Sequence, residues 1–430
     1  MNYIKILSIS VLGLLVQSCT QDTNWNQYLG PNRDATIRAD QLLNNWGETG
    51  PKKLWSFPLG EGYGGASIYD DEVYVLDRIK GESDILRCID LNSGEEIWNY
   101  TYEAPGEISY PGSRAVPTVD KRFIWSVGPK GDVYCFDKKS RKPVWNFNMK
   151  EKYNAGIPFF GSSQSPLLYH DQLIISLASD KAGLASYRKA SGELVWESRP
   201  FTGNATHVSP MLATFGGVDQ VIIISPYDRK DSTKVNEIVS FDARNGKELW
   251  KYEGLQSHAT LAAPVLISEN RLFITDCSYN GNFDPVSILL EIHKEGDKFL
   301  VKELFKTEDA GCKMHPGVFY NEHIFLNNNG KPSSMQCLDL SGKAVWESDS
   351  IPAFDLGGLI LINDLIIIQN GKNGDIHLVE ANPQEYKELG KASFFNSKKS
   401  QAWAPPAFSK GKLIVRDLEQ MVCVDLTRLE

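Results

Sequence analysis

Beyond its first eighteen residues the sequence has no apolar run long enough to cross a bilayer. The longest later run, Leu359–Ile368, is interrupted by Asn363 and Asp364, whereas a spanning helix needs about 20 apolar residues. An excess of basic charge is also absent, because 45 Lys and Arg residues face 54 Asp and Glu residues and leave a net charge of −9. Nucleic acids are bound through basic surfaces, so we exclude them as partners.

Cysteine and histidine are scarce, with seven of each. Neither a Cys-x-x-Cys pair nor a Cys/His spacing typical of zinc occurs, so we predict no metal site. Four cysteines hold the same place in a repeated motif described below, which indicates small packing residues: Cys88, Cys135, Cys337 and Cys423. For Cys277 and Cys312, which lie outside the motif, a disulfide in an oxidising compartment and two free thiols both remain open.

The N-terminus is typical of a targeting segment. Lys5 precedes an apolar run, Ile6–Val16, and Ser18 stands directly before Cys19. This arrangement resembles the bacterial lipobox, in which the cysteine is lipidated and becomes the new N-terminus. We therefore expect a signal peptide over residues 1–18 and a lipid anchor at Cys19. The alternative is a plain secretory signal cut near Ser18.

A tryptophan recurs through the chain with a common sequence before it. The tryptophans stand at positions 55, 98, 145, 196, 250 and 346, at intervals of 43 to 54 residues except the last, which spans two units. Residues 88–98 read CIDLNSGEEIW and residues 240–250 read SFDARNGKELW. The Gly four residues before the Trp is present in four of five copies, and Arg141 replaces it in the fifth.

Each copy of the motif predicts a β-hairpin. The apolar run up to the Asp is one strand, Asp-x-x-Ser/Asn-Gly is the turn, and the segment ending in Trp is the next strand. Upstream of each hairpin, segments such as 165–176 and 263–274 predict two more short strands around a polar turn. The unit therefore has four strands in about 46 residues, which is the size of a propeller blade.

Eight such units fit the chain. We expect their first strands to begin near Gly65, Ala115, Ser165, Ser209, Ala263, His315, Leu356 and Ala404. In the fifth unit Phe305 takes the Trp position, and in the seventh Leu389 falls near it. The last unit ends before a fourth strand, which residues 53–57 are expected to supply, so that the ring closes and leaves no free sheet edge. The predicted fold is thus an all-β, eight-bladed propeller of four-stranded antiparallel blades over residues 51–430, preceded by a lipidated tether and N-terminal strap over residues 19–50. A β-sandwich is the alternative, but it gives no reason for the repeat.

These motifs resemble the pyrroloquinoline-quinone-like (PQQ-like) β-propeller repeat family, of the bacterial envelope lipoprotein type. The segment from Trp25 to Asp34, with Trp46 and Gly50–Trp55, resembles envelope proteins of the same family. The resemblance covers about residues 25–426. It implies the fold, but it leaves the function open, because this fold carries both enzymes and scaffolds.

The residues just before each first strand should meet around the propeller axis and form its mouth. This set is the candidate ligand-binding site: Tyr63, Tyr110, Arg114, Phe160, Gln164, His207, His258, His315 and Trp403. Arg114 is the best candidate for contacting an anion, and the alternative is a structural arginine that caps loop carbonyls. Three histidines could bind a metal or a quinone carboxylate, but their different offsets from the nearby prolines favour ordinary loop residues.

The function expected from the resemblance is that of a non-catalytic, lipid-anchored, protein-binding scaffold in the cell envelope, monomeric and without a cofactor. It would face the periplasm or lie on the outer membrane. One alternative is a PQQ-dependent alcohol or sugar dehydrogenase. Quinoprotein dehydrogenases of this fold carry a Cys-Cys pair and an acidic calcium site, and neither occurs in this sequence, although sugar-dehydrogenase propellers also lack the pair. A second alternative is a propeller whose aromatic mouth binds a glycan or small ligand.

Overall fold

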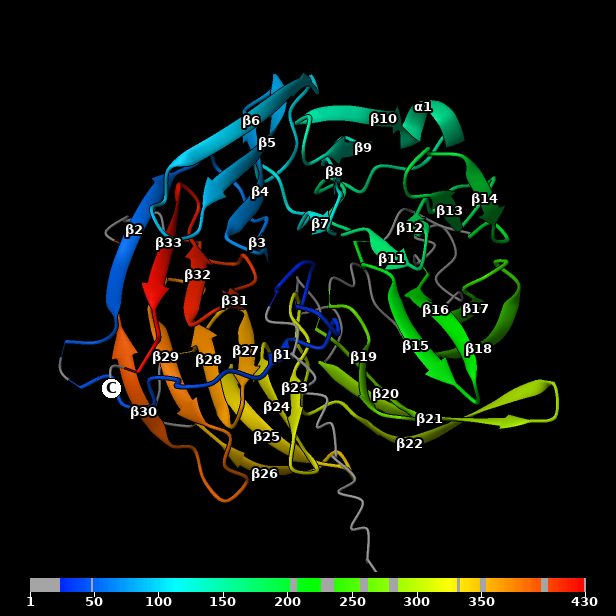
Figure 1. Ribbon diagram of the computed structural model, residues 1–430. Helices are drawn as coiled ribbons and strands as arrows, with labels where there is room; N and C mark the ends of the chain where they lie inside the picture. Colours follow the sequence, from blue (N-terminus) through cyan, green and yellow to red (C-terminus); the bar gives the residue numbers. More distant parts are fainter. Residues whose placement is uncertain are drawn as a thin grey trace, which may run out of the picture.

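The protein is a ring of eight antiparallel β-sheets (Figure 1). The computed structural model describes residues 24–47, 49–201, 207–225, 236–255, 262–277, 285–330, 333–348, 353–395 and 401–428. Within these ranges the chain is almost entirely strand and loop, and no helix has the length and apolarity needed to cross a membrane. The prediction of an all-β propeller with eight four-stranded blades is confirmed.

Blades 1 to 4 follow one another along the chain. Blade 1 consists of β3 (Ala66–Tyr69), β4 (Glu72–Ile79), β5 (Ser83–Asp90) and β6 (Glu96–Glu103). Blade 2 consists of β7 (Thr118–Val119), β8 (Phe123–Val127), β9 (Asp132–Asp137) and β10 (Lys142–Asn148), followed by the short helix α1 (Met149–Tyr153). Blade 3 consists of β11 (Leu167–Tyr169), β12 (Gln172–Ser176), β13 (Leu184–Arg188) and β14 (Leu194–Glu197). Blade 4 consists of β15 (Met211–Phe215), β16 (Val218–Ile224), β17 (Asn236–Asp242) and β18 (Glu248–Leu255).

Blades 5 to 8 complete the ring. Blade 5 consists of β19 (Val265–Ser268), β20 (Arg271–Asp276), β21 (Val286–Glu295) and β22 (Lys298–Thr307). Blade 6 consists of β23 (Val318–Tyr320), β24 (His323–Asn328), β25 (Ser334–Asp339) and β26 (Ala344–Glu347). Blade 7 consists of β27 (Leu359–Ile362), β28 (Leu365–Gln369), β29 (Ile376–Glu380) and β30 (Glu388–Ala392), and β1 (Thr36–Ile37) is added to its inner strand. Blade 8 consists of β31 (Ala407–Ser409), β32 (Lys412–Arg416), β33 (Gln420–Asp425) and β2 (Lys52–Pro58).

The ring is closed by a strand from the beginning of the chain, as the sequence predicted. Strand β2 pairs antiparallel with β33, with Lys52 opposite Asp425 and Trp55 opposite Cys423. Blade 8 therefore joins the two ends of the described chain, and its outer strand precedes the other three by about 350 residues. This pairing links residues far apart in sequence and leaves no blade incomplete.

Four of the six tryptophans of the repeat donate a hydrogen bond to the next blade. The indole Nε1 of Trp196 in blade 3 donates a hydrogen bond to the carbonyl oxygen of Ala243 in blade 4, at 3.1 Å. The ring also covers the turn glycine of the next blade, because a Cβ on Gly246 would lie 2.4 Å from Trp196. The same donation to the next blade is made by Trp55 to Leu91, Trp145 to Lys189 and Trp346 to Asn382. The glycine of the motif is therefore required both for its positive φ and for this close approach.

In blade 5, Phe305 takes the Trp position, and a Cβ on Gly342 of blade 6 would lie 2.5 Å from its ring. In blade 7 the strand pairing places Gly390 there, opposite Leu378, which is one residue from Leu389, near which the position was expected. Trp46, from the segment before β2, packs on Gly390, where a Cβ would lie 2.8 Å from it. An indole from outside the blade thus covers the position that the seventh repeat leaves empty.

The small residues of the motif lie directly opposite these aromatic rings. Cross-strand pairs are Cys88 with Trp98, Cys135 with Trp145, Ser186 with Trp196, Ser240 with Trp250, Cys337 with Trp346 and Cys423 with Trp55. All six cysteines and serines are fully buried. The prediction of small packing residues is confirmed. Cys277 and Cys312 are also buried, and both are free thiols.

Residues 24–47, which we call the strap, enter the centre of the ring before reaching blade 8 (Figure 1). The strap begins against blades 1 and 2, where Trp25 bridges to Ile68 and the Asn26 carbonyl accepts from Val119. It then turns, and the buried Arg33 guanidinium donates to the carbonyls of Ser165 and Pro166 in blade 3. It leaves as β1, parallel to β27 of blade 7. The strap therefore fills part of the central channel and ties four blades together.

Candidate functional site

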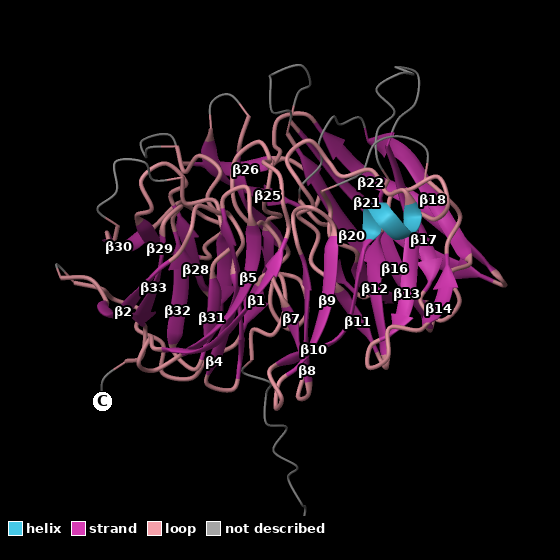
Figure 2. Ribbon diagram, turned by 90° about the horizontal axis from the view of Figure 1, so that it is seen from above, coloured by secondary structure: helices cyan, strands magenta, loops and turns pink. Residues whose placement is uncertain are grey.

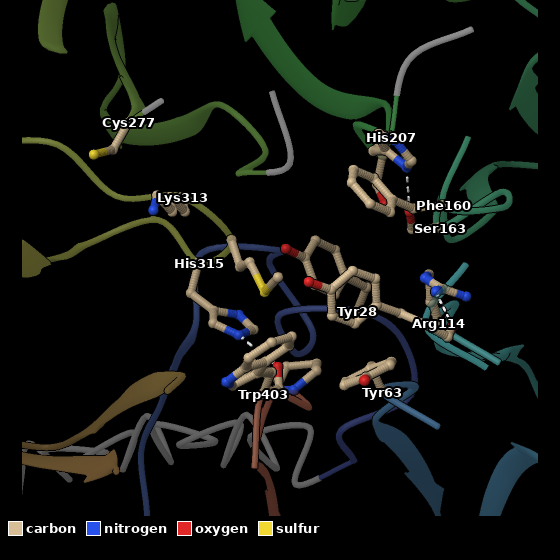
Figure 3. Close-up of a pocket in the computed structure, with 14 residues that line it drawn as sticks. Tyr28, Tyr63, Arg114, Phe160, Ser163, His207, Cys277, Lys313, His315 and Trp403 are labelled. Atoms are coloured by element: carbon tan, nitrogen blue, oxygen red, sulfur yellow. Dashed lines mark hydrogen bonds between the residues drawn. The ribbon is translucent and has the colours of Figure 1, made fainter. Parts of the chain in front are cut away.

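The connections between blades enclose a cavity on the propeller axis (Figure 3). It holds about 910 Å³ of empty space, counting the part open to solvent. Seven of the nine predicted mouth residues line it: Tyr63, Tyr110, Arg114, Phe160, His207, His315 and Trp403. They meet because each precedes the first strand of a blade, and the first strands of all blades surround the axis. We call this space the axial cavity.

Aromatic side chains form one continuous wall of the axial cavity. Tyr63 stacks on Trp403, with ring centroids 5.2 Å apart and planes 20° apart. Tyr110 lies 6.0 Å from Trp403 and 5.7 Å from Phe160, and Phe160 lies 5.7 Å from His207. Flat ligands such as sugars and aromatic rings are held by walls of this kind.

Hydrogen bonds fix two of these rings. The Tyr63 hydroxyl donates to Gln401 Oε1 at 2.7 Å, and the Trp403 indole donates to Asp355 Oδ2 at 3.0 Å. Burial raises the pKa of Tyr63 to about 12, so its hydroxyl keeps the proton that it donates. The wall is therefore held in place before any ligand arrives.

Arg114 is bonded to its own loop. Its Nη1 donates to the Gly112 carbonyl at 2.9 Å, and its Nη2 donates to the carbonyls of Ser109 and Tyr110. The guanidinium carbon lies 5.5 Å from the Tyr63 ring centroid. Burial lowers the pKa of Arg114 to about 10, so it remains charged at neutral pH, and no carboxylate among the described residues pairs with it. These bonds match the alternative role for Arg114, which is to cap loop carbonyls. The guanidinium also adds a fixed positive charge to the wall.

Two of the predicted histidines line the axial cavity in different states of bonding. His207 Nδ1 lies 2.8 Å from Ser163 Oγ. His315 donates from Nε2 to the Trp403 carbonyl at 2.8 Å, and its buried Nδ1 has no hydrogen-bond partner in the described chain. Burial lowers the pKa of His315 to about 4, so its ring is neutral. His258 lies outside the described residues.

The prediction that Gln164 lies in the mouth is corrected by the structure. Its side chain is buried and does not line the axial cavity, because it bonds to the backbone of Ser176 in its own blade. Its Oε1 accepts from the Ser176 amide at 2.6 Å, and its Nε2 donates to the Ser176 carbonyl. Gln164 therefore holds the beginning of β11 against β12 rather than facing a ligand.

Seven lining residues were not predicted: Tyr28, Ser163, Ser209, Cys277, Lys313, Met314 and Pro405. Lys313 and Met314 directly precede His315, and Ser163 lies between two predicted positions, so a wider window before each first strand would have found them. Tyr28 had no such signal, because it comes from the strap, which belongs to no repeat. Figure 3 shows its ring among those of the blades.

The lining does not fit a metal-held quinone. None of the lining residues is Asp or Glu, and the described residues contain no group of three His, Cys, Asp or Glu side chains able to hold a metal ion. Calcium is held by oxygen ligands, chiefly carboxylates, and the one arginine is already bonded to carbonyls. The described lining residues therefore offer no ligand set for a calcium-held quinone.

The chain matches a family and several solved structures. A family model described as outer membrane protein assembly factor BamB matches residues 39–277. BamB from Moraxella catarrhalis is 12% identical, with a TM-score of 0.60 over 87% of this chain and 99% of that chain. Quinohemoprotein alcohol dehydrogenase from Comamonas testosteroni is 14% identical, with a TM-score of 0.65 over 95% of this chain and 81% of that chain. Identities this low establish the fold alone. A search of curated proteins found no match.

Proposed function

The chain belongs to the family described as outer membrane protein assembly factor BamB, and from that premise we propose that it is a lipid-anchored, protein-binding scaffold of the bacterial cell envelope. Cys19 carries the lipid after residues 1–18 are removed, residues 19–50 form the tether and strap, and residues 51–430 form the binding propeller. A diacylated or triacylated cysteine holds a protein at a membrane stably, because more than one chain is buried.

The main support for a protein-binding role is the exposure of Phe159 beside the axial cavity. Its side chain is 72% exposed, the most exposed large apolar residue among those described. Its ring contacts Phe160, which lines the cavity, with centroids 5.2 Å apart. Phe159 continues the apolar lining of the cavity onto the surface, and contiguous apolar patches mark sites that bind partners. We therefore place the partner on the face of the ring that carries the mouth.

Site-specific photocrosslinking in the native bacterium tests this proposal. A photoreactive phenylalanine at position 159 should give an adduct with one envelope protein, and the same residue at exposed Leu300, on the outer strand of blade 5, should not. Phe159→Asp should weaken binding of the purified partner about tenfold without changing the melting temperature, since the interface would bury a charge. Equal adducts at both positions, or unchanged affinity of the Phe159 variant, would contradict the proposal.

A second function is favoured by the aromatic wall. Trp403, Tyr110 and Phe160 offer ring faces and edges to a sugar or another flat small ligand, as an alternative to a protein partner. Screening on a glycan array, followed by Trp403→Ala, separates the two functions. Binding that is lost in the variant would establish ligand recognition. Absence of binding by the unaltered protein would reject it.

The dehydrogenase alternative is tested directly by adding PQQ and calcium. We expect neither a shift in melting temperature nor dye-linked oxidation of alcohols or sugars, since the lining supplies no carboxylate ligand. A shift accompanied by oxidation would overturn the scaffold proposal.

A further inference from the structure

The strap begins on one particular face of the ring. Asn24 accepts a hydrogen bond from the amide of Asp70 in the β3–β4 turn, at 2.7 Å. Two residues later, the Asn26 side chain donates to the Val119 carbonyl at 3.1 Å, directly before the β7–β8 turn of blade 2. The turns that join the first to the second strand and the third to the fourth strand of each blade lie on this face, which we call the strap face. The connections between blades lie on the opposite side, as does α1 (Figure 2). Residues of these connections line the axial cavity.

Basic side chains gather on the strap face at blade 2 and the adjoining turn of blade 3. They come from the β7–β8 turn, the β9–β10 turn with the first residue of β10, and the β13–β14 turn, and five of them line a shallow hollow. The cluster, which we call the basic turns, consists of Lys121, Arg122, Lys138, Lys139, Arg141, Lys142 and Lys189.

Only part of this charge is neutralised within the protein. Lys189 pairs with Asp120 at 2.7 Å, Lys138 with Glu72 at 3.3 Å and Arg122 with Asp137 at 3.5 Å. The other four cations are exposed and make no ion pair with any described residue: Lys121, Lys139, Arg141 and Lys142. Glu193 of the β13–β14 turn is also exposed, so these turns keep a surplus of three positive charges on one edge of a protein whose net charge is −9.

The distance from the proposed anchor restricts what can meet this surface. Four residues separate Cys19 from Asn24, and these five steps along a fully extended chain span at most about 18 Å. The strap face is therefore close to the lipid headgroups, and the basic turns lie beside the point where the described chain begins. Anionic headgroups attract lysine and arginine strongly only within about a Debye length, roughly 8–10 Å.

We propose that the basic turns of blade 2 bind an anionic lipid surface and so orient the propeller, with the strap face against the membrane and the mouth facing away. The inference rests on the proposed anchor at Cys19, which supplies the proximity. A lipid anchor alone leaves the ring free to tumble on its tether, whereas a second contact fixes which face is presented to partners. The orientation leaves Phe159 and the axial cavity accessible to partners from the aqueous side.

Fluorescence quenching on nanodiscs tests the orientation with the intact acylated protein. A fluorophore is attached through Ser140→Cys, between Lys139 and Arg141, or through Glu107→Cys, on an exposed mouth-side loop. The six described cysteines are buried and do not compete for the label. Headgroup nitroxide should quench the label at 140 roughly twofold more than the label at 107 in discs with one-third phosphatidylglycerol. The difference should disappear in pure phosphatidylcholine.

Charge reversal identifies the residues responsible. Lys121→Glu with Lys139→Glu should abolish the preferential quenching at position 140. Lys80→Glu with Lys150→Glu changes the net charge equally on the mouth side and should leave the quenching intact. Equal quenching at 140 and 107 in anionic discs, or insensitivity to the Lys121 and Lys139 changes, overturns the proposal. A crosslink from position 140 to an acidic protein in place of quenching would assign the surface to a protein partner and also overturns it.

The proposal of a lipid anchor and the proposal of a lipid-binding surface can be tested separately. If the protein does not remain with the nanodiscs, the anchor proposal fails, and vesicle sedimentation of the unacylated full chain then decides the second proposal. Sedimentation with phosphatidylglycerol vesicles that falls roughly tenfold or more on reversal of Lys121 and Lys139 supports the lipid-binding surface. Failure to sediment with those vesicles contradicts it.

Discussion

The Trp55 indole donates a 2.9 Å hydrogen bond to the Leu91 carbonyl, and this bond joins the last blade of the ring to the first. Trp55 comes from β2, the N-terminal strand that completes blade 8, and Leu91 lies in the β5–β6 turn of blade 1. A Cβ on Gly94 in the same turn would lie 2.5 Å from the Trp55 ring. The closure of the ring therefore depends on the same indole–turn contact that joins three other pairs of neighbouring blades.

Replacing Trp55 by Ala should lower the free energy of unfolding by about 3–5 kcal/mol, because a buried ring is lost and the closing contact is left open. Trp55→Phe keeps most of the buried area and loses the hydrogen bond, so it should cost about 1 kcal/mol beyond any change in packing. Denaturant unfolding of both variants measures the difference. A loss of less than 1 kcal/mol in the Ala variant would show that β2 does not hold the ring closed.

Substitutions at Gly192 and Gly217 distinguish the cost of backbone strain from the cost of lost packing at two turns. Both have positive φ, +71° and +76°. A Cβ on Gly192 would lie 2.8 Å from the Trp145 ring, whereas a Cβ on Gly217 would meet nothing within 4 Å. Gly217→Ala should cost about 1 kcal/mol for the backbone alone. Gly192→Ala should cost at least about twice that, since the indole must also move. Equal losses in denaturant unfolding would contradict the contact between blades 2 and 3.

The repeat made the blades predictable because each one uses the same local interactions. The turn chemistry and the Trp position depend on residues within eleven positions of each other, and even Arg141, which breaks the glycine pattern, adopts φ +59° in the same turn. The Arg141 amide bonds to the Asp137 carbonyl as Gly246 bonds to Asp242. The closing strand was predictable because residues 53–57 had no other partner.

The parts that escaped prediction depend on contacts between unrelated segments. Nothing in the strap sequence shows that Arg33 would bond to blade 3, that Tyr28 would line the axial cavity or that Trp46 would cover Gly390. Mouth positions followed from the repeat, but side-chain directions did not, which is why Gln164 faces its own blade. The strap and these directions are set by tertiary packing, which a repeat pattern does not encode.

The six described cysteines should resist alkylation in the folded protein. All are buried, and burial raises the pKa of Cys88, Cys312 and Cys337 to about 12, so little thiolate is present at pH 8. Iodoacetamide should therefore label these sites only after denaturation, as followed by peptide mass spectrometry. Cys277 lines the axial cavity and should be the first of the six to react. Rapid labelling of Cys88 or Cys337 in the native state would contradict their packing against the tryptophans.

His315 should make the stability of the protein depend on pH. Its folded-state pKa is lowered from 6.5 to about 4 by burial, so below pH 6.5 the unfolded chain takes up a proton that the folded chain does not. The free energy of unfolding therefore falls as the pH drops from about 6.5 to about 4, with a slope of up to about 1.4 kcal/mol per pH unit from this one group. Above pH 6.5 the contribution is constant.

The variant His315→Gln isolates that contribution. Denaturant unfolding at several pH values between 7 and 4 should give a shallower loss of stability than in the unaltered protein, even if the variant is less stable at pH 7. Asp84 acts in the opposite direction, because burial raises its pKa to about 6 and protonation then favours the folded state. That effect is the same in both proteins and cancels in the comparison. The same substitution at exposed His170 controls for the loss of a histidine. Parallel pH profiles for the unaltered protein and His315→Gln would show that the His315 ring takes up its proton in the folded state, and the bond from its Nε2 to the Trp403 carbonyl would then be held by an imidazolium.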